Sequence, residues 1–417
     1  MIVDFSVKNY RSIRDLETLA MNAAKIVSKD KELDESNLIP FSDKLSLLKS
    51  KAIYGANASG KSTMIRALSS FLNIIFDSLK DEKILLRLID RHLLANGSIS
   101  DSTYFQLSFI YKDIYYRYGF EANTKVITAE WLFGTPGKKE VPFFIREGSE
   151  ITVNENQFPE GSKIIDLYKQ SDNDIARPNS LFLSVCRSFN QGLAREIVDY
   201  LNGYVIISGL GDRRMLKMAE ESLTDEHQRK KMAEWLRLAD TGIDDIYLYE
   251  VQQKDEKKSP AIYLTKTRRK PLINQIDNGE PLEFYMALHE SEGTQKMFEI
   301  GPAIFQALEL GRVLVLDEFD ARLHPLLSRK IVGLFNSKAN LNAQFIFATH
   351  DTNLLDAKLL RRDQICFVEK DNEGASHFYS LVDFKGIRND ASYEKDYIAG
   401  RYGAIPFLGD FKSLLES

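Results

Sequence analysis

The stretch GANASGKS, residues Gly55–Ser62, decides how this sequence folds. It satisfies the pattern GxxxxGK[ST], and it stands between a short apolar segment, Lys51–Tyr54, and a segment with helical spacing of apolar residues, Met64–Phe76. Glycines in such a loop allow successive backbone N–H groups to face a phosphate, and the following helix start adds partial positive charge. Strand, loop and helix together predict a phosphate-binding loop in an α/β fold.

Each position of this loop has an expected role in binding a nucleotide and its metal ion. Lys61 is expected to reach the β- and γ-phosphates, and the Ser62 hydroxyl is expected to bind Mg²⁺. Further contacts with the nucleotide are expected from the rest of the loop and the helix start, namely Gly55, Ala56, Asn57, Ala58, Ser59, Gly60 and Thr63.

Two further apolar strands are expected to deliver polar side chains at their ends. The first, in VLVLDE, ends at Asp317, which suits a Mg²⁺ ligand that acts through a metal-bound water, and at Glu318, which can polarise the attacking water. The second, Phe345–Phe347, leads to His350, whose neutral imidazole can donate a hydrogen bond to the γ-phosphate. Neither pattern is specific by itself, so these roles depend on the phosphate loop in the same chain.

The rest of the chain predicts an interrupted α/β domain. Residues 103–158 are rich in β-forming residues and predict several antiparallel strands. Residues from about 160 to 250 turn mostly helical, and the polar stretch 251–281 is expected to form a surface hairpin with loops. We therefore expect a mixed sheet plus an antiparallel β lobe, in which the N-terminal residues 1–160 and the C-terminal residues 285–417 flank a mainly helical insertion or lid, residues 161–284.

Composition limits the remaining possibilities. A net charge of −5 gives no whole-chain attraction to nucleic acid, so such binding would need a local basic patch. Cys186 and Cys366 are far apart and lack zinc-site spacing, which favours neither a disulfide framework nor structural zinc. No apolar run approaches the roughly 18–20 residues that a bilayer requires, and the start lacks a signal segment. A soluble cytoplasmic protein without membrane contact is expected.

Taken in order, the phosphate loop, SEGTQ (Ser291–Gln295), LVLDE and ATH resemble the motifs of ABC-type ATPase heads. The resemblance covers most of residues 1–160 and 285–417. It implies that Ser291 and Gly293 belong to a serine–glycine signature, which opens a helix and contacts the γ-phosphate held by the opposite subunit. The usual LSGGQ is not reproduced. A simple helix N-cap is the alternative role for the serine, and it is compatible with the signature role because the cap directs the N–H groups.

Two more positions follow from the same resemblance. Asp320, in EFDARLHP, occupies the place of the interfacial D-loop, which communicates between the two sites. The N-terminal KNYRSIRD resembles the opening of RecF and SMC heads and places Arg11 near the nucleotide base or phosphates, with a surface role as the alternative. The family's glutamine loop has three candidates, Gln106, Gln157 and Gln191.

The LHP that follows the acid pair and the ending YIAGRYGAIPFLGD narrow the resemblance. They are similar to the ABC-type AAA ATPases of the AbiL/RloA abortive-infection and overcoming-lysogenisation-defect (OLD) group. This implies ATP and Mg²⁺ as cofactors, hydrolysis with Glu318, His350 and Lys61 as catalytic residues, and a homodimer closed around ATP, with a higher homo-oligomer left open. A Toprim nuclease needs a glutamate and a DxD-type acidic set, and no DxD follows His350, so no nuclease is expected in this chain.

The first functional hypothesis is an ATP-dependent sensor or scaffold in antiphage, abortive-infection defence that controls a separately encoded effector, such as a Toprim-like nuclease. The alternative is a RecF- or SMC-like DNA-binding ATPase in DNA repair, which requires a basic track across the closed heads. A transporter head is weaker, because no membrane segment is present. Basic clusters occur at Arg213–Arg214, 227–231, 266–270 and Arg361–Arg362. Acidic residues lie among them, so a solvated surface is the simpler interpretation and nucleic-acid binding stays open.

Overall fold

The central sheet of the protein has the strand order β11-β17-β18-β5-β19-β20. The computed structural model describes residues 1–28, 30–94, 102–169, 177–190, 192–208, 213–251, 262–273, 276–277, 280–387, 392–406 and 409–411. The strands of this sheet are β11 (Val205–Ser208), β17 (Val313–Asp317), β18 (Gln344–Ala348), β5 (Ser50–Gly55), β19 (Ile365–Lys370) and β20 (Ser376–Ser380). β20 is antiparallel to β19, and the other neighbouring strands pair in parallel.

Parallel pairing explains why β17 and β18 contain continuous apolar runs, Val313–Leu316 and Phe345–Ala348. Every residue of β17, β18 and β5 is buried, because helices cover both faces of the sheet. In β18, Ile346 belongs to the core on one side, whereas Phe345 and Phe347 belong to the core on the other side. The carboxyl ends of β17, β18 and β5 meet at one edge, so the segments that follow them are brought together.

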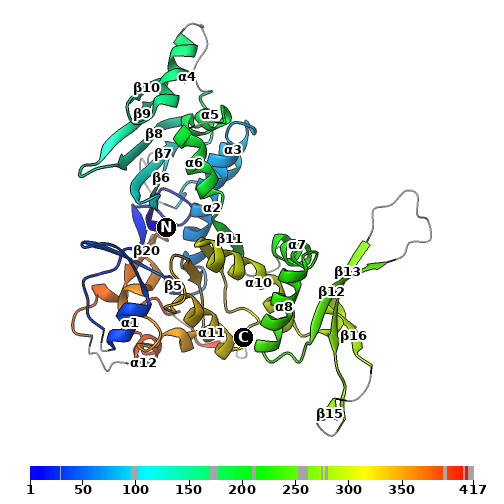
Figure 1. Ribbon diagram of the computed structural model, residues 1–417. Helices are drawn as coiled ribbons and strands as arrows, with labels where there is room; N and C mark the ends of the chain where they lie inside the picture. Colours follow the sequence, from blue (N-terminus) through cyan, green and yellow to red (C-terminus); the bar gives the residue numbers. More distant parts are fainter. Residues whose placement is uncertain are drawn as a thin grey trace.

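A second, antiparallel sheet has the strand order β10-β9-β8-β7-β6-β1-β2, and its strands β6 to β10 lie in the upper part of Figure 1. Its strands are β1 (Ile2–Lys8), β2 (Glu17–Ala20), β6 (Thr103–Tyr111), β7 (Ile114–Ala122), β8 (Ile127–Thr135), β9 (Val141–Glu147) and β10 (Glu150–Val153). The helix after the phosphate loop, α2 (Lys61–Asp77), packs between the two sheets. Its Phe71 stacks on Phe120 of β7, with ring centroids 5.4 Å apart, and shares a core with Val313 of β17. This is the predicted mixed α/β architecture with an antiparallel lobe.

The elements of residues 161–284 pack in three different places. The helices α4 (Pro159–Lys169), α5 (Phe182–Ser188) and α6 (Gly192–Leu201) join the core beneath the antiparallel sheet, and β11 joins the central sheet. The helices α7 (Arg213–Ser222) and α8 (Glu226–Leu238) pack on α10 (Glu292–Leu310). The strands β12 (Asp245–Val251), β13 (Ile262–Arg269) and β16 (Leu282–Tyr285) form a small sheet that projects to the right in Figure 1, near the paired β14 (Leu272–Ile273) and β15 (Ile276–Asp277). The three-part domain division stays a prediction.

The remaining elements are short or cover the central sheet. They are α1 (Lys31–Ser36), β3 (Leu38–Ser42), β4 (Leu45–Leu48), α3 (Ile84–Leu88), α9 (Met286–His289), α11 (Pro325–Phe335), α12 (Tyr393–Ile398) and the 3-10 turns η1 (Thr352–Leu354), η2 (Arg362–Gln364) and η3 (Leu381–Asp383). Cys186 and Cys366 are both buried and free, so neither forms a disulfide. Among the described residues, no helix combines the length and apolar character needed to span a membrane.

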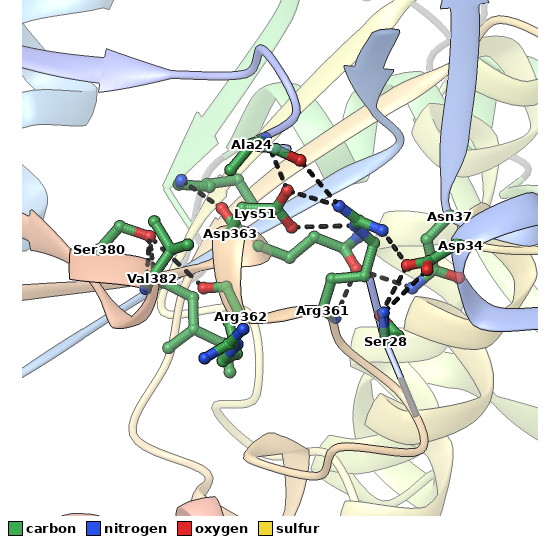
Figure 2. A network of polar contacts seen from close by, with 12 residues as sticks. Ala24, Ser28, Asp34, Asn37, Lys51, Arg361, Arg362, Asp363, Ser380 and Val382 are labelled. Carbon is green, nitrogen blue, oxygen red and sulfur yellow. Dashed lines mark hydrogen bonds and ion pairs between the residues drawn. The ribbon is translucent and has the colours of Figure 1, made fainter. Parts of the chain in front are cut away.

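A buried ion-pair network fastens the N-terminal segment to the central sheet (Figure 2). Arg361, which is 2% exposed, forms ion pairs with Asp34 and, at 2.8 Å, with Asp363. The Asp363 carboxylate also accepts a hydrogen bond from the backbone N–H of Ala24 at 2.8 Å. The backbone carbonyl oxygen of Asp363 accepts one from Lys51 Nζ at 2.6 Å. Arg361 therefore belongs to the interior, and it contributes neither to a solvated surface nor to a basic track.

Substitution of Arg361 by Ala is expected to lower the free energy of unfolding by about 3–5 kcal/mol, because it leaves the buried carboxylate of Asp363 without its cation. Chemical denaturation measures this as a lower midpoint at unchanged slope. Lys338→Ala is the control. Its side chain is 59% exposed and that of its ion-pair partner Glu35 is 66% exposed, so this pair is expected to contribute less than about 1 kcal/mol. Equal midpoint shifts for the two variants would contradict a stabilising role for the network.

Candidate active site

The phosphate loop joins β5 to α2, and two of its positions accept only glycine. A Cβ on Gly60, whose φ is 122°, would lie 2.2 Å from Ser376 Oγ. A Cβ on Gly55 would lie 2.4 Å from the carbonyl oxygen of Val368. Both distances are far shorter than atomic contacts allow, so the loop takes its path against β19 and β20 only because these side chains are absent.

Lys61 is folded back onto its own loop. Its Nζ donates hydrogen bonds to the carbonyl oxygens of Gly55, at 2.8 Å, and Ala56, at 3.1 Å, and the residue is 6% exposed. Burial lowers the pKa of this ammonium group to about 8, although the carboxylates of Asp317, Asp320 and Glu318 act in the opposite direction. An incoming phosphate can replace these carbonyl oxygens as the partner of the cation.

Asp317 is the last residue of β17 and carries an orphaned polar atom. It is 9% exposed, and its Oδ1 has no hydrogen-bond partner among the residues that the structure describes. A buried carboxylate oxygen normally has a partner, so this atom fits a metal ion or a metal-bound water. Mg²⁺ keeps several waters and phosphate oxygens as ligands, which is compatible with a protein contribution of only Asp317 and the Ser62 hydroxyl. In the described parts of the chain no group of three or more His, Cys, Asp or Glu residues could hold a metal by itself.

Glu318 lies at a sharp turn directly after the strand. Its φ of 50° is unusual for a residue with a side chain and redirects the chain at this point. Phe319 anchors the turn, because its buried ring packs edge-on against Phe345 at a centroid distance of 5.1 Å and its N–H donates to the carbonyl oxygen of Ala348 at 3.0 Å. The acid pair is thereby fixed against β18.

His350 and Asp320 are joined by a direct contact. The backbone N–H of His350 donates to the carboxylate of Asp320, with distances of 3.3 and 3.4 Å to its two oxygens. Partial desolvation of the ring, and then the nearby charge of Lys61, lower the pKa of the His350 imidazole, although Asp320 and Asp317 act in the opposite direction. The ring is therefore neutral at pH 7, the form in which one nitrogen donates and the other accepts a hydrogen bond.

Arg11 lies at the same cavity as the phosphate loop. Residues 58–63 and Arg11 both line a cavity of about 610 Å³. Arg11 has a φ of 51°, its N–H donates to the carbonyl oxygen of Asp90 at 2.6 Å, and its Nε pairs with the Asp90 carboxylate at 2.9 Å. The predicted position of Arg11 near a nucleotide is compatible with this placement.

Two serines that sequence reasoning did not single out support the loop. Ser376 Oγ donates to the carbonyl oxygen of Ser59 at 2.6 Å and lies 2.8 Å from Ser12 Oγ, which in turn lies 3.1 Å from Thr63 Oγ1. The only signal in the sequence is that Ser12 follows Arg11 in KNYRSIRD. Ser376 begins an ordinary strand, and nothing local distinguishes it.

Ser291 and Gly293 lie at the exposed start of α10. Ser291 acts as the N-cap, since its Oγ accepts the N–H of Thr294 at 3.2 Å. A Cβ on Gly293 would lie 2.9 Å from the carbonyl oxygen of Arg322, in the segment after Asp320. Neither residue is among those that line the phosphate-loop cavity of the same chain. The capping role is thus observed, and the signature role stays a prediction.

The candidates for the glutamine loop stay unresolved. Gln106 Oε1 accepts hydrogen bonds from Arg117, at 3.2 Å, and Trp131, at 3.1 Å, within the antiparallel sheet. Gln157 lies in a turn before α4, and Gln191 lies outside the described residues.

A protein-family model described as "AAA domain, putative AbiEii toxin, Type IV TA system" matches residues 52–178 and 242–356, which together make up more than half of the chain. Similar solved structures include an Smc head bound to the C-winged helix domain of ScpA, with 14% identity, 91% of this chain and 97% of that chain covered, and a TM-score of 0.44. The SMC head domain from Thermotoga maritima has 13% identity, 91% and 98% coverage, and a TM-score of 0.40. An Smc head with an extended coiled coil, bound to the C-terminal domain of ScpA and derived from Pyrococcus furiosus, has 13% identity, 96% and 98% coverage, and a TM-score of 0.42. No curated protein matches significantly.

The affinity for Mg-ATP is expected to fall as the pH rises above about 8. Lys61 has a pKa of about 8 in the free protein, and a phosphate partner raises this pKa, so binding takes up a proton where the free lysine is neutral. The expected loss is about tenfold per pH unit. Calorimetric titrations between about pH 7 and 9.5, in two buffers of different ionisation enthalpy, measure both effects. A constant affinity without proton uptake would show that Lys61 stays charged or does not bind phosphate.

Proposed function

The chain belongs to this AAA domain family, and from that premise we propose that it binds and hydrolyses ATP as an ABC-type head and pairs with a second copy around the nucleotide. The observation that carries the proposal is the convergence of Lys61, Asp317 and His350 at the carboxyl edge of three neighbouring parallel strands. We further propose that the pair serves as a sensor or scaffold in abortive-infection defence, controlling a separately encoded effector.

The residues of the site have complementary roles in hydrolysis. Lys61 exchanges its loop carbonyls for the β- and γ-phosphates, and neutral His350 donates a hydrogen bond to the γ-phosphate. Glu318 orients the attacking water and accepts its proton. Mg²⁺, when bound, neutralises charge on the phosphate oxygens, and Asp317 and Ser62 are the residues that would hold it.

Pairing of two chains is supported by the position of the α10 start. Ser291 is exposed, and it does not line the cavity of its own phosphate loop. In a two-fold pair, the helix N-terminus of one chain would face the γ-phosphate bound by its partner. ATP that contacts both chains binds the closed pair more tightly than the open one and therefore shifts the population toward closure.

The role in defence rests on the family description and on two motifs that follow the acid pair. The description names a toxin of type IV toxin–antitoxin systems. The LHP and YIAGRYGAIPFLGD segments resemble the AbiL/RloA and OLD-like group, which gives the more specific proposal of an abortive-infection ATPase. A separately encoded Toprim-like nuclease is the effector we propose.

The alternative of a DNA-repair ATPase lacks support from the basic clusters that the structure describes. In the cluster at 227–231, Arg229 pairs with Asp245 at 2.6 Å. In the cluster at 266–270, Lys266 and Arg268 both pair with Glu283, at 3.1 and 3.2 Å. Acidic neighbours thus balance these charges, and Arg361 is buried.

Replacement of Glu318 by Gln is expected to lower the steady-state rate of phosphate release at least about 100-fold while ATP binding persists, because the amide cannot accept the proton of the attacking water. Lys61→Ala is expected to lose both binding and turnover. Phosphate release and equilibrium binding of ATP measure the two properties separately. Glu309→Gln, an exposed glutamate on α10, is the matched control and is expected to leave both unchanged. Wild-type turnover in Glu318→Gln would contradict the assignment.

Mg-ATP is expected to double the absolute mass of Glu318→Gln in solution, and the added substitution Ser291→Arg is expected to prevent this. The long, charged arginine side chain would block the approach of α10 to the partner's nucleotide, and this position does not line the chain's own phosphate-loop cavity. Light scattering at equal protein concentration measures the mass. Thr224→Arg, which adds the same charge at an exposed position before α8, is the control and is expected to permit doubling. A doubled mass in the Ser291→Arg variant would contradict the signature role of Ser291 and leave it only the role of a helix N-cap.

A further inference from the structure

The cavity beside the phosphate loop is larger than a triphosphate requires. Its volume is about 610 Å³, within the range of sites that enclose whole small molecules. Residues 58–63 line one side, and Asp90, Arg91, Leu93 and Leu94 line another. The phosphates belong to the loop side, where Lys61 and the backbone N–H groups lie. The side formed by residues 90–94 therefore faces whatever is attached to those phosphates.

The position of this second wall is fixed by the turn that contains Arg11. The N–H of His92 donates to Asn9 Oδ1 at 3.1 Å, and His92 Nδ1 lies 2.7 Å from the carbonyl oxygen of Arg11. Asn9 and Arg11 both have positive φ, 53° and 51°, which makes the turn tight. The paired backbone and side-chain contacts between Arg11 and Asp90 complete the attachment. The wall is thus held at a set distance from the phosphate loop.

Two adjacent leucines at the end of this wall are exposed. Leu93 is 73% exposed and Leu94 is 67% exposed, and both line the cavity. Leu94 rests on the turn between β19 and β20, where a Cβ on Gly374 would lie 2.7 Å from its Cδ1. Neighbouring large apolar side chains at the mouth of a polar cavity are typical of a surface that a ligand covers.

We propose that Leu93 and Leu94 bind the base of the nucleoside triphosphate through the face of its ring. The proposal rests on the proposed function, because it assumes that the phosphates of the ligand occupy the loop. A base is flat and uncharged, and it gains from burial against aliphatic side chains as the leucines do. Aliphatic side chains contact the ring face of the base and make no hydrogen bonds with its edge. The leucines therefore contribute equally to the binding of adenine and guanine nucleotides.

The test compares Mg-ATP and Mg-GTP with Mg-tripolyphosphate, which has the phosphates and no base. Equilibrium binding of each ligand is measured for the full chain and for the double variant Leu93→Ser/Leu94→Ser. We expect ATP and GTP to bind about tenfold more weakly to the variant, because the apolar contact is lost, and tripolyphosphate to bind as before. Leu341→Ser is the matched control, since Leu341 is 72% exposed and lies before β18, at the opposite edge of the central sheet.

Other results separate this proposal from the proposed function. Nucleotide affinity within about twofold of the wild type, or an equal loss for tripolyphosphate, would overturn the base site and leave the phosphate site intact. A loss for only one of ATP and GTP would overturn binding through the ring face. Lys61→Ala is expected to weaken all three ligands. A wild-type chain that binds none of them would instead contradict the proposed function.

Discussion

The parallel register of β17, β18 and β5 is the constraint on which the candidate site depends. Leu316 of β17 lies beside Phe347 of β18, and Phe347 lies beside Ala52 of β5. In this register the strands end at one edge, so a carboxylate, an imidazole and a phosphate loop from distant parts of the chain become neighbours. The strands are buried on both faces, so a slip of one residue would move the side chains that fill one core into the other, where they no longer match the packing.

At that edge, Lys61 is held in an electrostatically unfavourable environment. Burial of an ammonium group disfavours its charge, and the nearby carboxylates of Asp317, Asp320 and Glu318 offset only some of that cost, so the pKa of Lys61 is lowered. The cation is therefore poised for a stronger partner. A phosphate carries full negative charge, so in the proposed function it would stabilise the charged form of Lys61 more strongly than the loop carbonyls do.

Sequence reasoning predicted the features of the fold that local pattern determines. Buried parallel strands produce continuous apolar runs, and the polar residues at their ends stand out for that reason. The serine pair Ser12 and Ser376 escaped this reasoning, because their contact joins positions at opposite ends of the chain. The burial of Arg361 also escaped it, since an arginine next to another arginine in sequence resembles a charged surface until its acidic partners are located. The attachment of β11 to β17 depends on pairing across more than a hundred residues and has no local signal.

The segment after the acid pair contacts both the phosphate site of its own chain and the start of α10, the two surfaces that the proposed pair would bring together. Asp320 accepts the backbone N–H of His350, and two residues later the carbonyl of Arg322 abuts Gly293 at the start of α10. Because Gly293 and the carbonyl of Arg322 pack this closely, the start of α10 and the segment after Asp320 have little freedom to move independently. In the proposed pair, therefore, a change at the γ-phosphate of one site passes to the surface that completes the other site through three consecutive residues. No longer pathway through the protein is required for the two sites to act together.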